Sequence, residues 1–142
     1  MNNTVVLVAR IFLAAIFVLS GFAKLTDPGS IEVPFSTAGM IAGRGLPAPV
    51  VLAYLAGLLE FLGGVAVLIG FQTRIAGWAL ALFSIAAGLL FHLGPTGDQT
   101  MDMINQIMLM KNVAIAGGFL LLAVYGAGAL SVDARRGGAV HA

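Results

Sequence analysis

Four long apolar segments take up most of this chain of 142 residues. A segment of about 20 apolar residues matches the roughly 30 Å hydrocarbon core of a bilayer, because an α-helix rises about 1.5 Å per residue. We therefore predict four membrane-spanning helices, over residues 5–23, 49–70, 75–93 and 107–126. Charged residues make up only 9% of the chain, against about 25% in soluble domains, which is typical of an integral membrane protein.

Composition also narrows the range of functions. The net charge of +1 gives no reason to expect a nucleic-acid partner. Cysteine is absent, so disulfides, thiolate metal sites and dithiol redox chemistry are excluded. The two histidines of the chain, His92 and His141, match no recognised metal motif, and we expect no metal site.

The predicted fold is an all-α, membrane-embedded four-helix bundle that forms a single domain over residues 1–142. Arg10 lies inside the first apolar run rather than ahead of it, which indicates a retained helix rather than a secretory signal.

Two polar connections are expected on one side of the membrane. The first, between spans one and two, has the pattern of a short interfacial helix near residues 31–41, and the second covers residues 94–106.

An even number of spans places both termini on the same side of the membrane. Basic residues favour the cytoplasm for that side, because cytoplasmic ends of spans carry an excess of lysine and arginine. The residues that carry this signal are Arg74, Arg135 and Arg136. We therefore expect both termini to lie in the cytoplasm.

One face of each span carries small or polar residues three, four or seven positions apart. These faces are Arg10, Ala14, Phe17, Gly21 and Lys24; Ala53, Ala56, Gly57, Glu60, Gly63, Gly64 and Val67; Gly77, Ala81, Ser84, Gly88 and His92; and Lys111, Ala114 and Gly118. Small residues allow membrane helices to approach closely. We therefore expect these four faces to meet inside the bundle.

Glu60 lies near the middle of the second span, where an ionised side chain costs roughly 2.5 to 3.5 kcal/mol even on lenient insertion scales. Counted along the helices, Arg10 lies close enough in depth for its long side chain to reach this carboxylate. We therefore predict a buried ion pair between Arg10 and Glu60. Two interpretations stay open, because such a pair either fixes the register of the bundle or takes part in function.

A second polar group gathers at the opposite end of the spans from the termini. It consists of Lys24, His92, Gln106, Lys111 and Asn112. Histidine exchanges a proton near neutral pH, lysine stabilises an anionic oxygen and amides bind carbonyls, which together suit a quinone headgroup. The alternative is that Lys24 is a snorkelling anchor and His92 a simple interfacial residue.

Several motifs occur in the order found in a known family. They are Ser20-Gly21-Phe22-Ala23-Lys24-Leu25, Leu58-Leu59-Glu60-Phe61-Leu62-Gly63-Gly64, Gly70-Phe71-Gln72-Thr73-Arg74, Lys111-Asn112 and Gly128-Ala129-Leu130-Ser131-Val132-Asp133. With these motifs the chain resembles the DoxX family of small bacterial membrane proteins over nearly its whole length. The resemblance implies a location in the bacterial inner (cytoplasmic) membrane. The positions of this chain that match the family pattern are Arg10, Lys24, Glu60, Arg74, His92, Lys111, Asn112, Ser131 and Asp133.

The resemblance implies an accessory subunit of a respiratory or other quinone-linked oxidoreductase complex, without catalysis by this chain alone. The chain has no visible means of holding haem or flavin by itself, so electron transfer would require a partner. We therefore expect no cofactor bound by the chain alone, and quinone is the candidate ligand. The expected partners are the lipid bilayer and other membrane subunits or further copies of the chain. Two alternatives stay open: a structural or assembly protein, and a small proton-linked transporter that uses Glu60.

Overall fold

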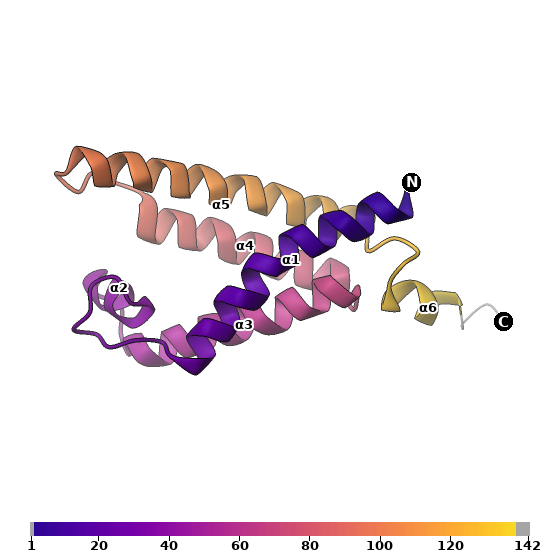
Figure 1. Ribbon diagram of the computed structural model, residues 1–142, viewed down its shortest axis with the longest axis horizontal. Helices are drawn as coiled ribbons and strands as arrows, with labels where there is room; N and C mark the ends of the chain where they lie inside the picture. Colours follow the sequence, from indigo (N-terminus) through magenta and orange to yellow (C-terminus); the bar gives the residue numbers. More distant parts are fainter. Residues whose placement is uncertain (1, 139–142) are drawn as a thin grey trace.

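The computed structural model describes residues 2–138, and these residues form helices with no strand. The helices are α1 (Asn3–Thr26), α2 (Thr37–Gly43), α3 (Pro49–Ile69), α4 (Thr73–His92), α5 (Gln99–Tyr125) and α6 (Val132–Gly138). Four of them, α1, α3, α4 and α5, are long and apolar enough to cross a membrane. The predicted all-α membrane fold with four spans and a short helix after the first is confirmed (Figure 1).

Short polar side chains and glycines fix the ends of these helices. Asn2 accepts a hydrogen bond from the backbone N–H of Thr4 at the start of α1, and Asp98 accepts one from Met101 at the start of α5. Such caps satisfy backbone donors that have no partner within the helix. Gly70 ends α3 with a φ of 73°, a left-handed conformation that favours glycine and permits the tight turn into α4.

Two helices differ from the boundaries predicted from the sequence. The short helix α2 begins at Thr37 rather than near residue 31, because Ser36 provides its N-terminal cap through the backbone N–H of Gly39. Helix α5 begins at Gln99, eight residues earlier than predicted, so most of the expected loop over residues 94–106 is helical. Hydropathy marks only the part of a helix that lies in hydrocarbon, whereas α5 has 27 residues and a length of about 40 Å.

The spanning helices form two antiparallel pairs. Helix α1 packs along α3 and α5 packs along α4, whereas α3 contacts α4 less and α1 barely contacts α5. The close packing of α1 on α3 depends on glycine: a Cβ atom at Gly21 would lie 2.4 Å from the backbone nitrogen of Phe61. The two pairs lie together near the termini and diverge toward the opposite end, where α2 is found (Figure 1).

The end that carries the termini is held together by Arg10, which is buried with 1% of its surface exposed. Its guanidinium donates hydrogen bonds of 2.6 to 2.9 Å to the carbonyl oxygens of Val67 and Leu68 in α3 and of Ala127 and Leu130 after α5. The last carbonyls of a helix have no partner within it and carry partial negative charge. Arg10 therefore provides hydrogen-bond donors for the carbonyl groups at the C-terminal end of α3. It also links the α5–α6 connection to that end of the helix.

Asp133 in α6 joins the same end of the molecule to the start of α4. Its carboxylate accepts hydrogen bonds from the backbone N–H groups of Gln72, at 2.7 Å, and Thr73, at 2.9 Å. Partial burial alone would raise the pKa of Asp133, but these two hydrogen bonds and the nearby charge of Arg136 outweigh it and lower the pKa below its usual value. Asp133 therefore caps α4 as a carboxylate.

The predicted inward faces are correct for three of the four spans. Arg10, Ala14, Phe17 and Gly21 are the buried residues of α1; Ala53, Gly57, Glu60, Gly64 and Val67 those of α3; and Gly77, Ala81, Ser84 and Gly88 are buried in α4. The prediction for α5 was wrong, because Lys111 and Ala114 are exposed and the buried residues are Ala116, Phe119, Leu122 and Ala123. Helix α5 turns this face toward α4, its main neighbour.

Candidate functional site: a cavity between the helix pairs

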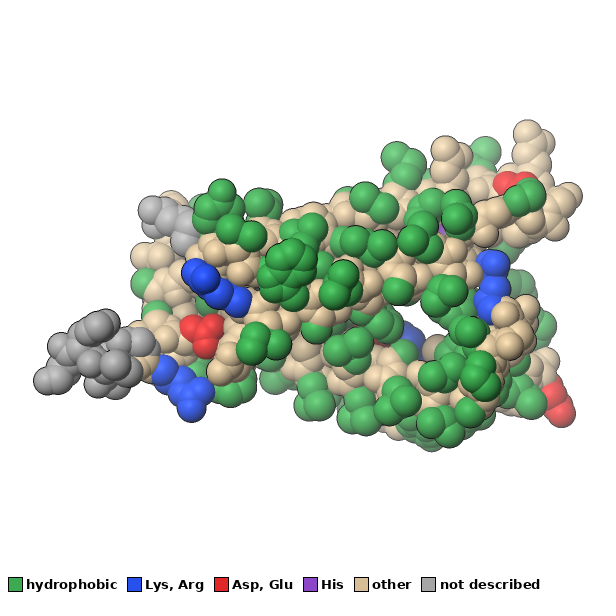
Figure 2. All heavy atoms as spheres, turned by 180° about the vertical axis from the view of Figure 1, so that it is seen from behind, with side chains coloured by type: hydrophobic (Ala, Val, Ile, Leu, Met, Phe, Trp, Pro, Cys, Tyr) green, Lys and Arg blue, Asp and Glu red, His purple; other side chains and the backbone are tan. Residues whose placement is uncertain are grey.

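A cavity of about 360 Å³ lies between the two helix pairs, in the half of the molecule away from the termini. All four spans and α2 line it. Figure 2 shows a hollow on one face of the molecule in this region, with a basic side chain visible inside it. Its polar lining residues are Ser20, Lys24, Thr37, Glu60, Ser84, His92, Lys111 and Asn112. Four of the five residues predicted to bind a ligand therefore lie around one cavity: Lys24, His92, Lys111 and Asn112.

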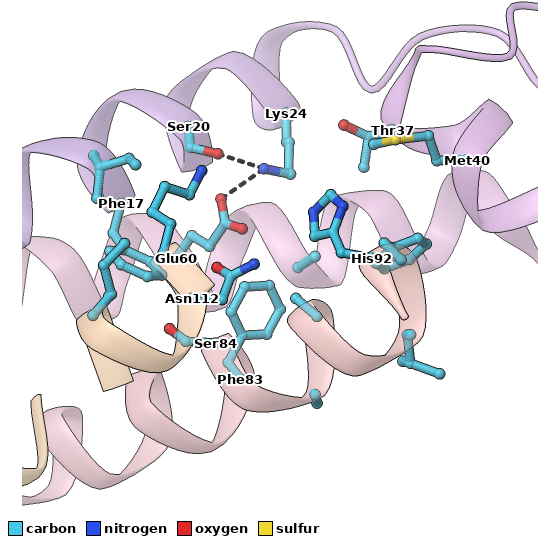
Figure 3. A pocket seen from close by; sticks show the side chains of 18 of the residues that line it. Phe17, Ser20, Lys24, Thr37, Met40, Glu60, Phe83, Ser84, His92 and Asn112 are labelled. Atoms are coloured by element: carbon cyan, nitrogen blue, oxygen red, sulfur yellow. Dashed lines mark hydrogen bonds and ion pairs between the residues drawn. The ribbon is translucent and has the colours of Figure 1, made fainter. Parts of the chain in front are cut away.

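Glu60 pairs with Lys24 and not with Arg10, so the predicted Arg10–Glu60 pair was wrong. The Nζ atom of Lys24 lies 2.8 Å from Oε2 of Glu60 and also donates to Oγ of Ser20 (Figure 3). Arg10 instead reaches the carbonyl of Val67, seven residues along α3 from Glu60, which is about 10 Å at the helical rise. The antiparallel contact of Gly21 with Gly57 and Phe61 brings Lys24 to the level of Glu60.

The Lys24–Glu60 pair forms a neutral, polar part of the cavity wall. Both side chains are largely buried, with 17% of the Lys24 side chain and 7% of the Glu60 side chain exposed. Either ion alone would be costly at this depth in a membrane. Each compensates the charge of the other, and Ser20 satisfies a further proton of the ammonium group.

His92 lies at the end of α4 and faces the same space (Figure 3). Its Nδ1 atom lies 3.2 Å from the side-chain oxygen of Asn105 in α5. Because an amide oxygen only accepts hydrogen bonds, Nδ1 carries a proton in this contact, and in the neutral form of the ring this is the only ring N–H. Nε2 is then left as an acceptor for a hydroxyl or amine of a ligand.

Lys111 and Asn112 enter the cavity from α5. Lys111 is the thirteenth residue of a helix of 27, so it lies near the middle of α5 rather than near its start as the sequence suggested. Its ammonium group lies 3.3 Å from the thioether sulfur of Met108. Asn112 lies beside Phe83 and Ser84 of α4 (Figure 3). These two residues place a cation and an amide on the wall formed by α5.

The remaining walls are apolar and partly aromatic. Phe17 comes from α1, Phe83 and Phe91 come from α4, and Ile115 comes from α5. Helix α2 covers the end of the cavity with Thr37, Met40 and Ile41. A hydrogen bond of 2.7 Å from Nη2 of Arg44, just after α2, to the carbonyl oxygen of Phe91 links this cover to α4. A flat, apolar ring with a few polar substituents fits such a lining.

Gln106 is the one predicted ligand residue that does not line the cavity. It is exposed on α5, because it follows Asn105 by one position and so points about a quarter turn away from the face of Asn105 and Asn112. Sequence reasoning also missed Ser20, although it lies four residues before Lys24 on the same helical face. No sequence pattern indicated that residues of α2 line the cavity, because only the fold brings them there.

A smaller cavity of about 230 Å³ lies at the other end of the molecule. It is lined by Gln72, Thr73, Arg74, Gly126, Ala127 and Asp133. The carboxylate of Asp133 already accepts hydrogen bonds from the backbone N–H groups at the start of α4. We therefore regard this smaller cavity as part of the packing between α4 and α6. Among residues 2–138, no group of three or more histidine, aspartate or glutamate side chains is arranged to hold a metal ion. His141 lies outside the described residues.

Four apolar spans, a covering helix and one cavity between two helix pairs define a small multi-pass membrane protein with an internal cavity. The chain belongs to the DoxX family, whose family model matches residues 5–93.

Two relatives extend this similarity beyond the matched region. The chain is 38% identical over 128 residues to the inner membrane protein YqjF of Escherichia coli (strain K12), covering 90% of this chain and 88% of that protein. It is 33% identical over 132 residues to the inner membrane protein YphA of the same organism, covering 91% of this chain and 88% of that protein. No solved structure is significantly similar to this chain.

Proposed function

We propose that this protein is an accessory subunit of a quinone-linked oxidoreductase complex and that its cavity binds the quinone ring. The observation that carries the proposal is the convergence of Lys24, His92, Lys111 and Asn112 on one cavity with aromatic walls. These residues come from three different spans, so their proximity is a property of the fold and not of local sequence.

The cavity suits a single substituted ring in size and chemistry. Its volume of about 360 Å³ lies at the lower end of the range of small-molecule sites. Lys24, Lys111 and Asn112 offer donors for ring carbonyls, and Nε2 of His92 offers an acceptor for a ring hydroxyl. Phe83 and Phe91 supply apolar contact area on α4.

The residues around the cavity can bind a quinone and exchange a proton with it, which is the role of an accessory subunit. A quinone changes its protonation when it is reduced, and His92 is a suitable group to exchange a proton with a ring hydroxyl. The electrons have to come from a redox centre in a partner subunit, since a proton-exchanging and ring-binding site supplies none. We therefore assign binding and positioning of the ring to this chain and electron transfer to its partner.

We infer a location in the inner membrane with the termini in the cytoplasm. Both named relatives are inner membrane proteins. The end with the termini carries Arg74, Arg135 and Arg136, and an excess of basic residues is typical of the cytoplasmic side. With this orientation the cavity opens in the outer half of the bilayer.

The test is photo-crosslinking of a short-chain quinone analogue to the purified protein in lipid nanodiscs. We expect labelled peptides from α4 and α5, and a loss of labelling of about tenfold in His92→Ala and Asn112→Ala. Gln106→Ala is the matched control, because Gln106 is a polar residue of α5 outside the cavity, and it should label like the wild type. Labelling that is equal in all four proteins would favour the structural or assembly role instead.

A further inference from the structure

The charges around the cavity do not balance. Its ionisable lining residues are Lys24, Glu60, His92 and Lys111. Lys24 and Glu60 neutralise each other, and the ring of His92 is hydrogen-bonded to the side chain of Asn105. Among the residues that the structure describes, Lys111 has no carboxylate partner, and its close contact is the uncharged sulfur of Met108. One positive charge on the cavity wall is therefore left without a counterion.

The depth of Lys111 makes this imbalance significant. It lies inside the apolar run over residues 107–126, about 6 Å from the start of that run at the helical rise, and its neighbours along the chain are Met110 and Asn112. A charged side chain inside the apolar part of a membrane helix faces protein, water or a counterion rather than lipid. The amide of Asn112 adds hydrogen-bonding capacity beside this charge. A cation and an amide on one wall form a suitable site for an anionic oxygen.

The cavity is reached from the side of the molecule. Helices α1 and α5 barely contact each other, and the two helix pairs diverge around the cavity. Figure 2 shows the resulting hollow on a lateral face covered with hydrophobic side chains, the kind of face that lipid contacts in a membrane. At the end of the molecule α2 covers the space with Met40 and Ile41. The ligand therefore enters from the bilayer, which requires an amphiphilic molecule.

We propose that the ligand of this cavity is an acidic amphiphile, whose ionised oxygen binds Lys111 and Asn112 while its apolar part lies against the aromatic walls. This inference rests on the proposed function and narrows it. If the ligand is a quinone, its ring carries an ionised hydroxyl. The same chemistry is offered by a lipid with a carboxylate or a phosphate, and the experiment separates the two sources.

The experiment compares three probes in nanodiscs of neutral phosphatidylcholine. The first is an alkyl hydroxynaphthoquinone, whose ring hydroxyl is ionised at neutral pH. The second is the methylnaphthoquinone with the same alkyl chain, and the third is dodecanoate. Dissociation constants are measured for the wild type, Lys111→Met, Lys111→Arg and the control Gln106→Ala. Lys111→Met keeps an unbranched side chain, one atom shorter, and removes its charge.

We expect the wild type to bind the hydroxynaphthoquinone about tenfold more tightly than the methyl analogue, a difference of about 1.4 kcal/mol. The difference should fall to twofold or less in Lys111→Met and persist in Lys111→Arg and Gln106→Ala. A wild type that does not distinguish the two quinones, or a Lys111→Met variant that keeps the tenfold difference, overturns the inference.

The outcomes for the inference and for the proposed function are distinguishable. Equal binding of both quinones in the cavity overturns the acidic ligand and leaves the quinone site intact. Binding of dodecanoate with a loss in Lys111→Met, and no binding of either quinone, supports the acidic group and contradicts the quinone. No binding of any probe contradicts both.

A second measurement uses the wild type alone and does not depend on the folding of a variant. The ionised hydroxynaphthoquinone absorbs visible light, so its apparent pKa can be read when it is bound. A cation beside the ring oxygen stabilises the anion and should lower this pKa below its value in protein-free nanodiscs. An equal or higher pKa in the presence of the protein contradicts the site at Lys111.

Discussion

The Lys24–Glu60 ion pair predicts a measurable coupling between two residues that are 36 positions apart in the sequence. The perturbations are Glu60→Gln and Lys24→Met, alone and together. Each single substitution leaves one ion without its partner in the wall of the cavity, whereas the double substitution removes both charges. The free energy of unfolding should therefore fall less in the double variant than the sum of the two single effects.

The magnitude follows from the geometry of the pair. Removing one member of a fully buried ion pair costs about 3 to 5 kcal/mol. Here the Nζ–Oε2 distance is 2.8 Å, but 17% of the Lys24 side chain is exposed to the cavity, so we expect about 2 to 3 kcal/mol for each single variant. The double variant should lose about 2 kcal/mol in total, because no unpaired ion remains. The expected coupling is about 2 to 4 kcal/mol.

A second cycle provides the control. Arg10→Met and Glu60→Gln should be additive within about 0.5 kcal/mol, since the guanidinium of Arg10 binds carbonyl oxygens about two helical turns away from Glu60. Unfolding is followed by far-ultraviolet circular dichroism in mixed micelles with increasing denaturing detergent. Additivity in the Lys24 cycle, or coupling in the Arg10 cycle, would refute the assignment of the pair.

Two further predictions concern the helix contacts that hold the cavity in place. Gly21→Ala should lower the unfolding temperature by several degrees, because its Cβ would lie 2.4 Å from the backbone nitrogen of Phe61. Gly117→Ala should not lower it, because no atom lies within 4 Å of that Cβ and alanine favours the helix. Equal effects of the two substitutions would contradict the packing of α1 on α3. Asp133 has a lowered pKa in the folded state, so its contribution to stability is present above its unfolded pKa of about 3.9 and is lost as pH falls through the lower folded pKa. Asp133→Asn should lower the unfolding temperature at neutral pH and flatten its decline in acid, and an unchanged pH profile would count against this cap.

Much of this fold could be predicted from the sequence because membrane spans and their small-residue faces follow simple periodicity. The inward faces of α1, α3 and α4 carry glycine, alanine and serine at helical spacing, and the structure buries them. The face of α5 could not be predicted in the same way. Lys111 was assumed to point into the bundle core, but α5 packs mainly on α4 and turns Phe119 and Ala123 toward it.

The partner of Glu60 shows why residues can be placed along a helix more easily than between helices. The sequence predicts that a carboxylate at this depth is paired, and it is. Depth counting alone favoured Arg10, because it ignores the register between α1 and α3. That register is set by the contact of Gly21 with Gly57, two glycines whose role as a contact point becomes clear only when the helices are placed together.

The candidate site was predictable in its composition but not in its shape. Lys24, His92, Lys111 and Asn112 were selected as polar residues near one end of the spans, and the structure brings them to one cavity. The divergence of the helix pairs and the position of α2 depend on long-range packing, which leaves no local pattern. Gln106 was included because of its type and position, and its helical face excludes it.

The most direct test of the central claim is to isolate the tagged protein from its native membrane in a mild detergent and identify what accompanies it. Mass spectrometry of the extracted small molecules and of the co-purifying proteins gives both parts of the answer. We predict a bound quinone together with subunits of an oxidase or dehydrogenase, and loss of the quinone but not of the subunits in His92→Ala. A homo-oligomer that carries no quinone and no redox partner would contradict the account.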